Sequence, residues 1–405
     1  MTDSILDRDI NYHARTAVQT GALIIGGNFQ GLGLLRSLFE KNIPAYLLDN
    51  KFCIGRFSKY PRKFFRCPSI RERPLFFEFL KRLAQKENLE GWIIFPEDDE
   101  TLIFLSRYKS LLERYYRIPV PPWEVTRFAV EKRLTCQLAD KFDIATPRTY
   151  YPLDIQELRS TEIKFPAVLI LSVNRALEME SLQRSILVKD RQGLLRLFRE
   201  TLEVTPDAKL MVQETIPDGE NHRFSVFSLC KTGELLGKVS VRRIRQYPVY
   251  SGYAVNCAVL ISMPGLEETA RRFLRAMGYY GLSEIEFILD ARDGKYKLIE
   301  MHAHTREWYT LAARAGINLP YLLYCDLLGL KYKSPPEFSG NIRWLYLSTD
   351  PYVSPGEIAG SRKKISDYIN LLKGLSNGIL LFLKDPLPIM ARVFLISCLW
   401  IKHKF

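Results

Sequence analysis

The sequence has few of the residues that build metal clusters or covalent cross-links. Its seven cysteines are scattered without any Cys-x-x-Cys pair, and 405 residues include only five histidines. An odd number of unpaired, scattered cysteines argues against a disulfide framework and against a structural zinc site. We therefore expect a protein of a reducing compartment, the cytoplasm.

Long hydrophobic runs are also missing. No apolar run reaches the roughly 18 residues that a membrane-spanning helix needs, and residues 1–20 lack the apolar core of a signal peptide. The apolar runs nearest to that length, residues 379–383 and 393–401, flank a charged and proline-containing stretch. They are too short to span a bilayer but long enough to lie in an interface.

Acidic residues are outnumbered, with 45 Asp and Glu against 58 Lys and Arg and a net charge of +13. Such an excess favours nucleotide phosphates, nucleic acid or an anionic membrane surface, and charge alone does not choose among them. No nucleic-acid recognition module accompanies it, so we expect no nucleic-acid partner. The length predicts two or three domains.

The N-terminal part predicts a βαβ unit. Residues 22–25 form a buried strand, residues 26–33 a glycine-rich turn, residues 34–40 a helix, and residues 45–49 a second parallel strand. The glycine spacing in this turn does not fit Gly-x-Gly-x-x-Gly, which argues against a nicotinamide or flavin cofactor.

A third predicted strand, residues 91–96, ends at the acidic cluster 97–100. Ligands of open parallel sheets bind beyond the carboxyl ends of the strands, so this cluster could face a substrate. Acids also suit the N-terminus of a helix, and that interpretation stays open.

Beyond the Pro121-Pro122 pair, strands and helices no longer alternate strictly, which predicts an α+β body appended to an α/β domain. We expect an N-terminal domain over 1–122, a catalytic body over 123–335 and a basic, amphipathic tail over 336–405. The predicted elements of the body are helix 131–142, strand 165–171, helix 192–202, strand 209–214, strands 224–230 and 235–241, and helix 266–277.

Residues 284–287 and 297–304 predict two strands that carry acids on one face, because residues two apart in a strand point the same way. The turn-forming residues 290–294 would close them into a hairpin that brings Glu286 opposite Glu300. Two carboxylates that leave other positions to water and phosphate oxygens are a usual magnesium site. A solvated amphipathic hairpin is the alternative.

Taken in sequence order, the βαβ unit, strand 165–169, segment 212–219, the basic segment 243–248 and the acidic hairpin resemble an ATP-grasp protein. The resemblance is to the carbamoyl-phosphate-synthase-like branch, the carboxylate-amine ligases, and it covers roughly residues 20–332. It implies a small parallel α/β pre-grasp domain, a two-lobed ATP-grasp body and a helical C-terminal tail. It also implies ATP and Mg²⁺, or Mn²⁺ in its place, with a small carboxylate and an amine, amino acids among them, as substrates. A homodimer is compatible with it.

The resemblance also implies roles for single residues. Gln213, Glu214 and Ile216 would form the hinge that receives adenine, where Glu214 accepts from the adenine amino group or the ribose. Glu286 and Glu300 would bind magnesium. Arg243 and Arg245 would pair with an anionic intermediate, because guanidinium groups bind phosphate and carboxylate in a fork. An exposed basic strand face is the alternative for Arg242, Arg243 and Arg245.

Two motifs depart from the family pattern. Ile170 stands where the family has a lysine that reaches a nucleotide phosphate, and Arg175 and Arg184 are the nearest basic residues. His302 and His304 stand where the family has an asparagine and an arginine. His302 could still ligate a cation, although imidazole prefers softer metals than Mg²⁺. We therefore keep three hypotheses: a working ligase, an inactive nucleotide-binding or scaffold protein, and an enzyme with an altered metal preference.

The tail supplies one further hypothesis. Residues 361–405 contain eight Lys or Arg and two acids, a net charge of +6, among large apolar residues. This mixture suits peripheral contact with an anionic membrane at its inner face. A helical hairpin that caps the catalytic body is the alternative.

Overall fold

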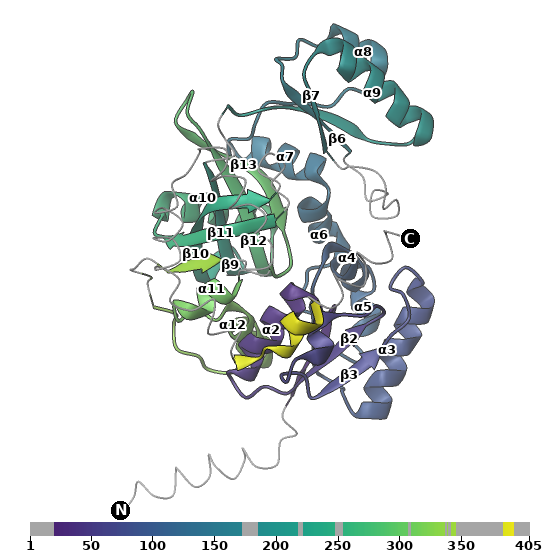
Figure 1. The fold of residues 1–405 in the computed structure, drawn as a ribbon, viewed down its shortest axis with the longest axis vertical. Helices are drawn as coiled ribbons and strands as arrows, with labels where there is room; N and C mark the ends of the chain where they lie inside the picture. Colours follow the sequence, from purple (N-terminus) through teal and green to yellow (C-terminus); the bar gives the residue numbers. More distant parts are fainter. Residues whose placement is uncertain are drawn as a thin grey trace, which may run out of the picture.

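The computed structural model of the chain describes residues 20–171, 185–217, 222–247, 254–306, 309–336, 338, 342–345 and 384–392. For residues 245–247, 254–256, 344 and 345 it describes the backbone alone. In Figure 1 a parallel sheet lies at the bottom, a large antiparallel sheet at the left, and a small antiparallel sheet at the top. The predicted combination of a parallel α/β part with an α+β part is confirmed at this level.

The N-terminal sheet has four parallel strands in the order β3-β2-β1-β4. Strands β1 and β4 are buried along their whole length, which explains their continuously apolar sequences. The elements of this part are β1 (Ala22–Ile25), α2 (Phe29–Phe39), β2 (Ala45–Asp49), the 3-10 helix η1 (Ile54–Phe57), β3 (Lys63–Arg66), α3 (Arg73–Glu87), β4 (Ile93–Pro96), α4 (Asp99–Arg107) and α5 (Lys109–Leu112).

Helix α2 begins at Phe29, inside the stretch predicted to be a glycine-rich turn, so the predicted start at residue 34 is wrong. The cause is local hydrogen bonding: the N–H of Gly27 donates to Asp49 at 2.8 Å, and the N–H of Asn28 donates to Glu97 at 2.9 Å. Buried carboxyl groups thus bind N–H groups at the helix N-terminus that would otherwise lack partners. Gly26 has a φ of 102°, and a Cβ atom there would lie 2.0 Å from a Glu97 oxygen, so this turn requires glycine.

Two short helices, α6 (Trp123–Val130) and α7 (Lys132–Lys141), lead to the small antiparallel sheet, whose strand order is β5-β8-β6-β7. Helices α8 and α9 belong to this part, and α9 is amphipathic with Leu194 and Phe198 buried. The elements are β5 (Thr149–Tyr150), α8 (Ile155–Ser160), β6 (Ala167–Leu171), β7 (Ser185–Val188), α9 (Arg191–Val204) and β8 (Leu210–Glu214).

The large sheet is antiparallel in the order β13-β12-β9-β10-β11-β14. The predicted strands and the helix before the hairpin are present, and β10 continues past the predicted end at residue 241 through the basic segment. The elements are β9 (Arg223–Lys231), β10 (Glu234–Tyr247), β11 (Ala254–Ile261), α10 (Pro264–Met277), β12 (Gly281–Asp290), β13 (Lys295–His302), α11 (Tyr309–Arg314), α12 (Leu319–Leu328) and β14 (Arg343–Leu345).

Apolar packing joins the N-terminal part to the large sheet. One buried cluster contains Ile94 together with Ile285, and another contains Leu35 together with Leu319. The small sheet and its helices instead have a separate core. The predicted boundary at residue 122 stays a prediction, because buried contacts cross it. Within the described part of the chain, no helix combines the length and apolarity needed to cross a bilayer.

Candidate active site

The predicted acidic hairpin is present. Glu286 pairs with Glu300, and Glu284 pairs with His302, across the antiparallel strands β12 and β13. The register shifts between Glu286 and Phe287, so Ile299 is an extra residue on β13. Glu284 is 0% exposed and Glu286 is 5% exposed, so a solvated hairpin is excluded as an account of these two acids.

Arg243 of β10 faces this pair of buried acids. Its Nη2 atom forms a short ion pair with Glu286 and lies 3.4 Å from Glu284 Oε1. The guanidinium is itself buried, with Arg223 3.8 Å from the other oxygen of Glu286. A contact between Arg243 and an anionic intermediate stays a prediction, and so does that of Arg245, of which only the backbone is described.

The two acids differ in their electrostatic surroundings. Burial, and then the charge of Glu286, raise the pKa of Glu284. Burial also opposes ionisation of Glu286, but the charge of Arg243 and a hydrogen bond from His302 hold its pKa well below the usual value. The pair therefore carries an ionised Glu286 beside an acid that ionises with difficulty.

His302 completes the first group of potential metal ligands. Its Nε2 atom lies 3.2 Å from Glu286 Oε1 and 4.0 Å from Glu300 Oε2. One ligand atom from each of these three residues lies within 4.8 Å of the other two. Burial and Arg306 lower the pKa of His302, but the two glutamates outweigh them and raise it to about 9. The two carboxylates fit magnesium, whereas the imidazole suits a softer metal.

A second such group joins the N-terminal part to the hairpin. Asp99, the first residue of α4, has an oxygen 3.2 Å from Nε2 of His304, and His302 is close to both. The Nδ1–H of His304 donates to the carbonyl of Thr305 at 2.8 Å. Within the acidic cluster after β4, Asp98 caps α4, as the helix-terminus interpretation predicted, and Asp99 meets His304. Contact of this cluster with a substrate stays a prediction.

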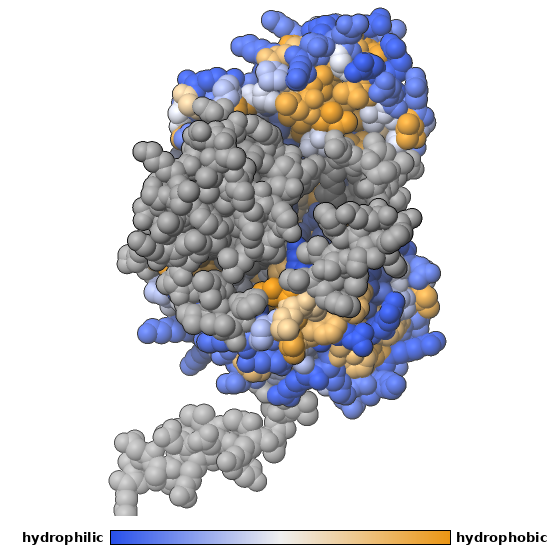
Figure 2. All heavy atoms as spheres, viewed as in Figure 1, coloured by the Kyte–Doolittle hydropathy of each residue, from blue (hydrophilic) through white to orange (hydrophobic). Residues whose placement is uncertain are grey.

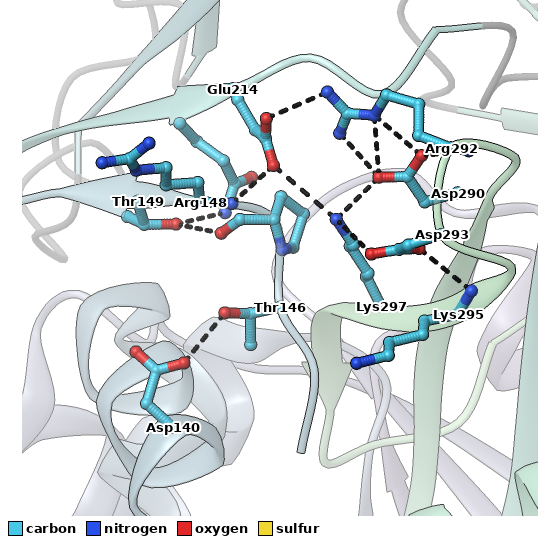
Figure 3. A network of polar contacts seen from close by, with 12 residues as sticks. Asp140, Thr146, Arg148, Thr149, Glu214, Asp290, Arg292, Asp293, Lys295 and Lys297 are labelled. Atoms are coloured by element: carbon cyan, nitrogen blue, oxygen red, sulfur yellow. Dashed lines mark hydrogen bonds and ion pairs between the residues drawn. The ribbon is translucent and has the colours of Figure 1, made fainter. Parts of the chain in front are cut away.

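Glu214, the last residue of β8, is held by other groups of the protein (Figure 3). Its Oε1 accepts a hydrogen bond from the backbone N–H of Arg148 at 2.9 Å, and its Oε2 accepts one from Arg292 at 3.2 Å. Lys297 Nζ lies 3.7 Å from Oε1. Arg292 and Lys297 belong to the β12–β13 hairpin, so this network joins the small sheet to the large one. Contact between Glu214 and adenine stays a prediction and requires an exchange of partners.

Asp290 anchors the same network from a fully buried position. Lys297 Nζ lies 2.6 Å from it, and Arg292 donates to both of its oxygens. The hydrogen bond from Arg292 is the largest influence on the pKa of Asp290. Together with the one from Lys297 it outweighs burial and holds this pKa below its ordinary value. Lys297 is thus a basic residue of the candidate nucleotide site that the sequence reasoning missed.

The other two predicted hinge residues are Gln213 and Ile216. Gln213 is buried and donates from Nε2 to Thr149 Oγ1 at 3.0 Å, and Ile216 is half-buried two residues after β8. Arg184 and Arg175 lie outside the described residues. Their roles at the nucleotide stay predictions.

Ile170 has a structural reason to be apolar. Its side chain is 5% exposed and belongs to a small buried cluster with Cys136 and Met211. A lysine at this position would place an ammonium group among these side chains, where burial strongly disfavours charge.

We therefore expect Ile170→Lys to lower the free energy of unfolding by about 2–5 kcal/mol rather than to strengthen nucleotide binding. Leu187→Lys is the matched control, because Leu187 lies on neighbouring β7 and is 59% exposed, and it should change stability by less than about 0.5 kcal/mol. Urea unfolding followed by circular dichroism measures both. Equal stability of the two variants would show that residue 170 has access to solvent or ligand.

Comparison with known proteins agrees with this geometry. No protein-family model matches the chain. It is 21% identical over 325 residues to a D-aspartate ligase of Enterococcus faecium, a match that spans 73% of this chain and 74% of the relative. Among solved structures it superposes on the biotin carboxylase domain of a 2-oxoglutarate carboxylase from Hydrogenobacter thermophilus, bound to MgADP and bicarbonate. That match has a TM-score of 0.63 and 15% identity and covers 80% of this chain and 74% of that one.

The chain has the ATP-grasp fold. Two further ATP-grasp structures support this. An L-amino acid ligase from Bacillus licheniformis matches with a TM-score of 0.59 and 14% identity, over 78% of this chain and 76% of that one. An N5-carboxyaminoimidazole synthetase from Staphylococcus aureus matches with a TM-score of 0.61 and 11% identity, over 81% of this chain and 82% of that one. The sequence resemblance stated above is thereby confirmed for the fold. The division of the body into two grasp lobes stays a prediction.

Proposed function

We propose that the protein is an ATP- and Mg²⁺-dependent carboxylate-amine ligase that forms an amide bond through an acyl phosphate. The pairing of Glu286 with Glu300 on adjacent strands of an ATP-grasp fold is the observation that carries the proposal. The names of a D-aspartate ligase and an L-amino acid ligase among the similar proteins support amino acids as the substrate class. A homodimer is part of the proposal, in line with the dimer named for the biotin carboxylase domain.

In this proposal Glu286 and Glu300 would hold Mg²⁺, or Mn²⁺, which when bound reduces the charge barrier to attack on a phosphate. His302, beside both acids, would be a third ligand or would orient them. Glu214, Gln213 and Ile216 would line the adenine site, with Lys297 adding positive charge beside Glu214.

Arg243 would act in two states. Without a cation it neutralises Glu284 and Glu286, as observed. With a cation on Glu286, its guanidinium would be able to pair with the acyl phosphate, as would Arg245. Positioning and charge neutralisation are most of the work in phosphoryl transfer, so these residues need no covalent role.

We expect Glu300→Gln and Glu286→Gln to reduce kcat/KM for amino-acid-dependent ADP release by about 100-fold or more. Replacing a residue that only hydrogen-bonds to a metal ligand already lowers metal affinity or activity by about 10–100-fold, and these two acids would be ligands themselves. The assay is ADP release with ATP, Mg²⁺ and a panel of amino acids, followed by mass analysis of the amide product. Glu268→Gln, at an exposed acid of α10, is the control and should leave the rate unchanged. Equal rates in all three variants would contradict the proposal.

The departures at Ile170, His302 and His304 favour one alternative, a nucleotide-binding or scaffold module without catalysis. Calorimetric titration with ATP, with and without Mg²⁺, separates the two. Mg²⁺-dependent ATP binding without ADP release for any amino acid would support the alternative. ADP release together with a ligated product would rule it out.

A further inference from the structure

One surface segment of the N-terminal part is basic, aromatic and free of acids. Residues 51–66, which run from the end of β2 through η1 and β3, contain six Lys or Arg, five aromatic residues and no Asp or Glu. All six bases are exposed: Lys51, Arg56, Lys59, Arg62, Lys63 and Arg66. Lys63 pairs with Glu87, whereas Arg56 and Lys59 lie over the rings of Phe64 and Tyr60. The segment therefore presents positive charge outward.

A segment from near the C-terminus docks on this region. Asp385, only 2% exposed, accepts a hydrogen bond from the Ser58 hydroxyl at 2.7 Å and one from the Lys59 N–H at 3.3 Å. Arg392 lies over the ring of Phe29 at 4.4 Å. Figure 1 shows this segment, residues 384–392 in yellow, lying across α2. The one acid of the segment is therefore turned inward, onto the protein.

Apolar side chains of the docked segment point outward. Leu387 is 56% exposed and Met390 is 60% exposed, and their three-residue spacing puts them on one face of the helical turn 387–392. Phe39 at the end of α2 and Phe52 beside Lys51 are 47% and 51% exposed. Figure 2 shows apolar surface gathered where Figure 1 draws the docked segment, with hydrophilic residues around it. Basic and apolar side chains thus share one region of the surface.

The sequence on both sides of the docked segment is apolar. Residues 379–383 before it and residues 393–401 after it contain no charged residue, and the chain ends on two lysines and a histidine among its last five residues. Both runs lie outside the described residues.

We propose that the surface formed by residues 51–66 and 384–392, with Phe39, docks the protein on an anionic membrane. Each Lys or Arg near such a membrane strengthens binding about fivefold at ordinary ionic strength, and inserted apolar side chains add to it. The aliphatic side chains Leu387 and Met390 favour a bilayer over RNA, which is read by stacking on aromatic rings and by pairing with phosphates.

Vesicle co-sedimentation of the full-length chain tests this surface. The protein should sediment with vesicles of phosphatidylcholine and phosphatidylserine, bind poorly to phosphatidylcholine alone, and dissociate as salt is raised. Lys51→Glu with Arg56→Glu should weaken binding at least about tenfold, because each reversal removes an attraction and adds a repulsion. Leu387→Asp with Met390→Asp should weaken it as well.

The matched control is Arg196→Glu with Arg199→Glu on α9, which changes the net charge equally at the far end of the molecule in Figure 1. It should bind vesicles nearly as the natural protein does. ADP release, or ATP binding if there is no turnover, should be unchanged in all variants and shows that they are folded. Equal loss in the control and the Lys51/Arg56 variant, no loss in either, or binding to a single-stranded RNA that vesicles do not compete away would each overturn the proposal.

Discussion

Replacing Arg243 by methionine is expected to lower the free energy of unfolding by about 3–5 kcal/mol, the usual effect of removing one member of a buried ion pair. The reason is the pair of acids that it faces: Glu284 and Glu286 are almost fully buried, and the Arg243 charge is the largest favourable influence on the ionised form of each. Urea unfolding at neutral pH measures the loss. Part of it should be recovered below about pH 4, where protonation of carboxylates reduces the need for a counter-charge.

Arg242→Met is the control for this experiment. Arg242 is the preceding residue of β10, has the same side chain and is exposed, so its replacement should change stability by less than about 0.5 kcal/mol. The pair of variants also separates two roles for Arg243. A variant that keeps its stability but loses ADP release would show that the guanidinium serves the substrate rather than the buried acids.

Much of the candidate site could be predicted because its pattern is local. Alternation with a period of two predicted the strands, and turn residues predicted the hairpin that pairs Glu286 with Glu300. What a strict period of two could not show is the effect of the extra residue Ile299. It brings Lys297, opposite Ile288, to the same face as Glu300, although the two residues are three apart in sequence.

A register shift also affects the basic segment of β10. A period of two would place Arg243 and Arg245 on one face. The pairing of β10 with β11 instead shifts its register between these two residues. Arg243 pairs with Ala258 and Arg245 pairs with Cys257, so a bulge separates the two arginines. The position of this bulge depends on a partner strand that lies elsewhere in the sequence and pairs only when the sheet has formed.

Contacts between distant parts of the chain were the least predictable. Nothing local in the acidic cluster after β4 indicates that Asp99 meets His304 or that Glu97 turns inward beneath Gly26. The Glu97 contact follows from the pairing of β1 with β4, which places Pro96 beside Ile25. The Asp99 contact follows from the packing of the N-terminal sheet against the large sheet, which depends on apolar surfaces spread over the whole chain. The cluster of acids could be recognised in the sequence, but the partner of each acid could not.

Glu97 is expected to make stability depend on pH. Burial is the main cause that raises the pKa of its carboxyl from 4.5 to about 8, against the hydrogen bond from Asn28 that lowers it. Between these two pH values the folded protein keeps a proton on Glu97 that the unfolded chain releases. The folded state then binds more protons than the unfolded state, so stability falls as pH rises through this window.

Glu97→Gln removes the titrating proton while its amide oxygen can still accept from Asn28. We expect the variant to match the natural protein near pH 5 and to exceed it by about 4 kcal/mol near pH 8, because each pKa unit corresponds to about 1.4 kcal/mol. Urea unfolding at the two pH values measures the difference. Glu90→Gln, at an exposed acid of the same domain, should give the same small change at both. An advantage of Glu97→Gln that does not grow with pH would mean that Glu97 is ionised in the folded protein, and its carboxylate would then bind the N-terminus of α2 as a bound anion does.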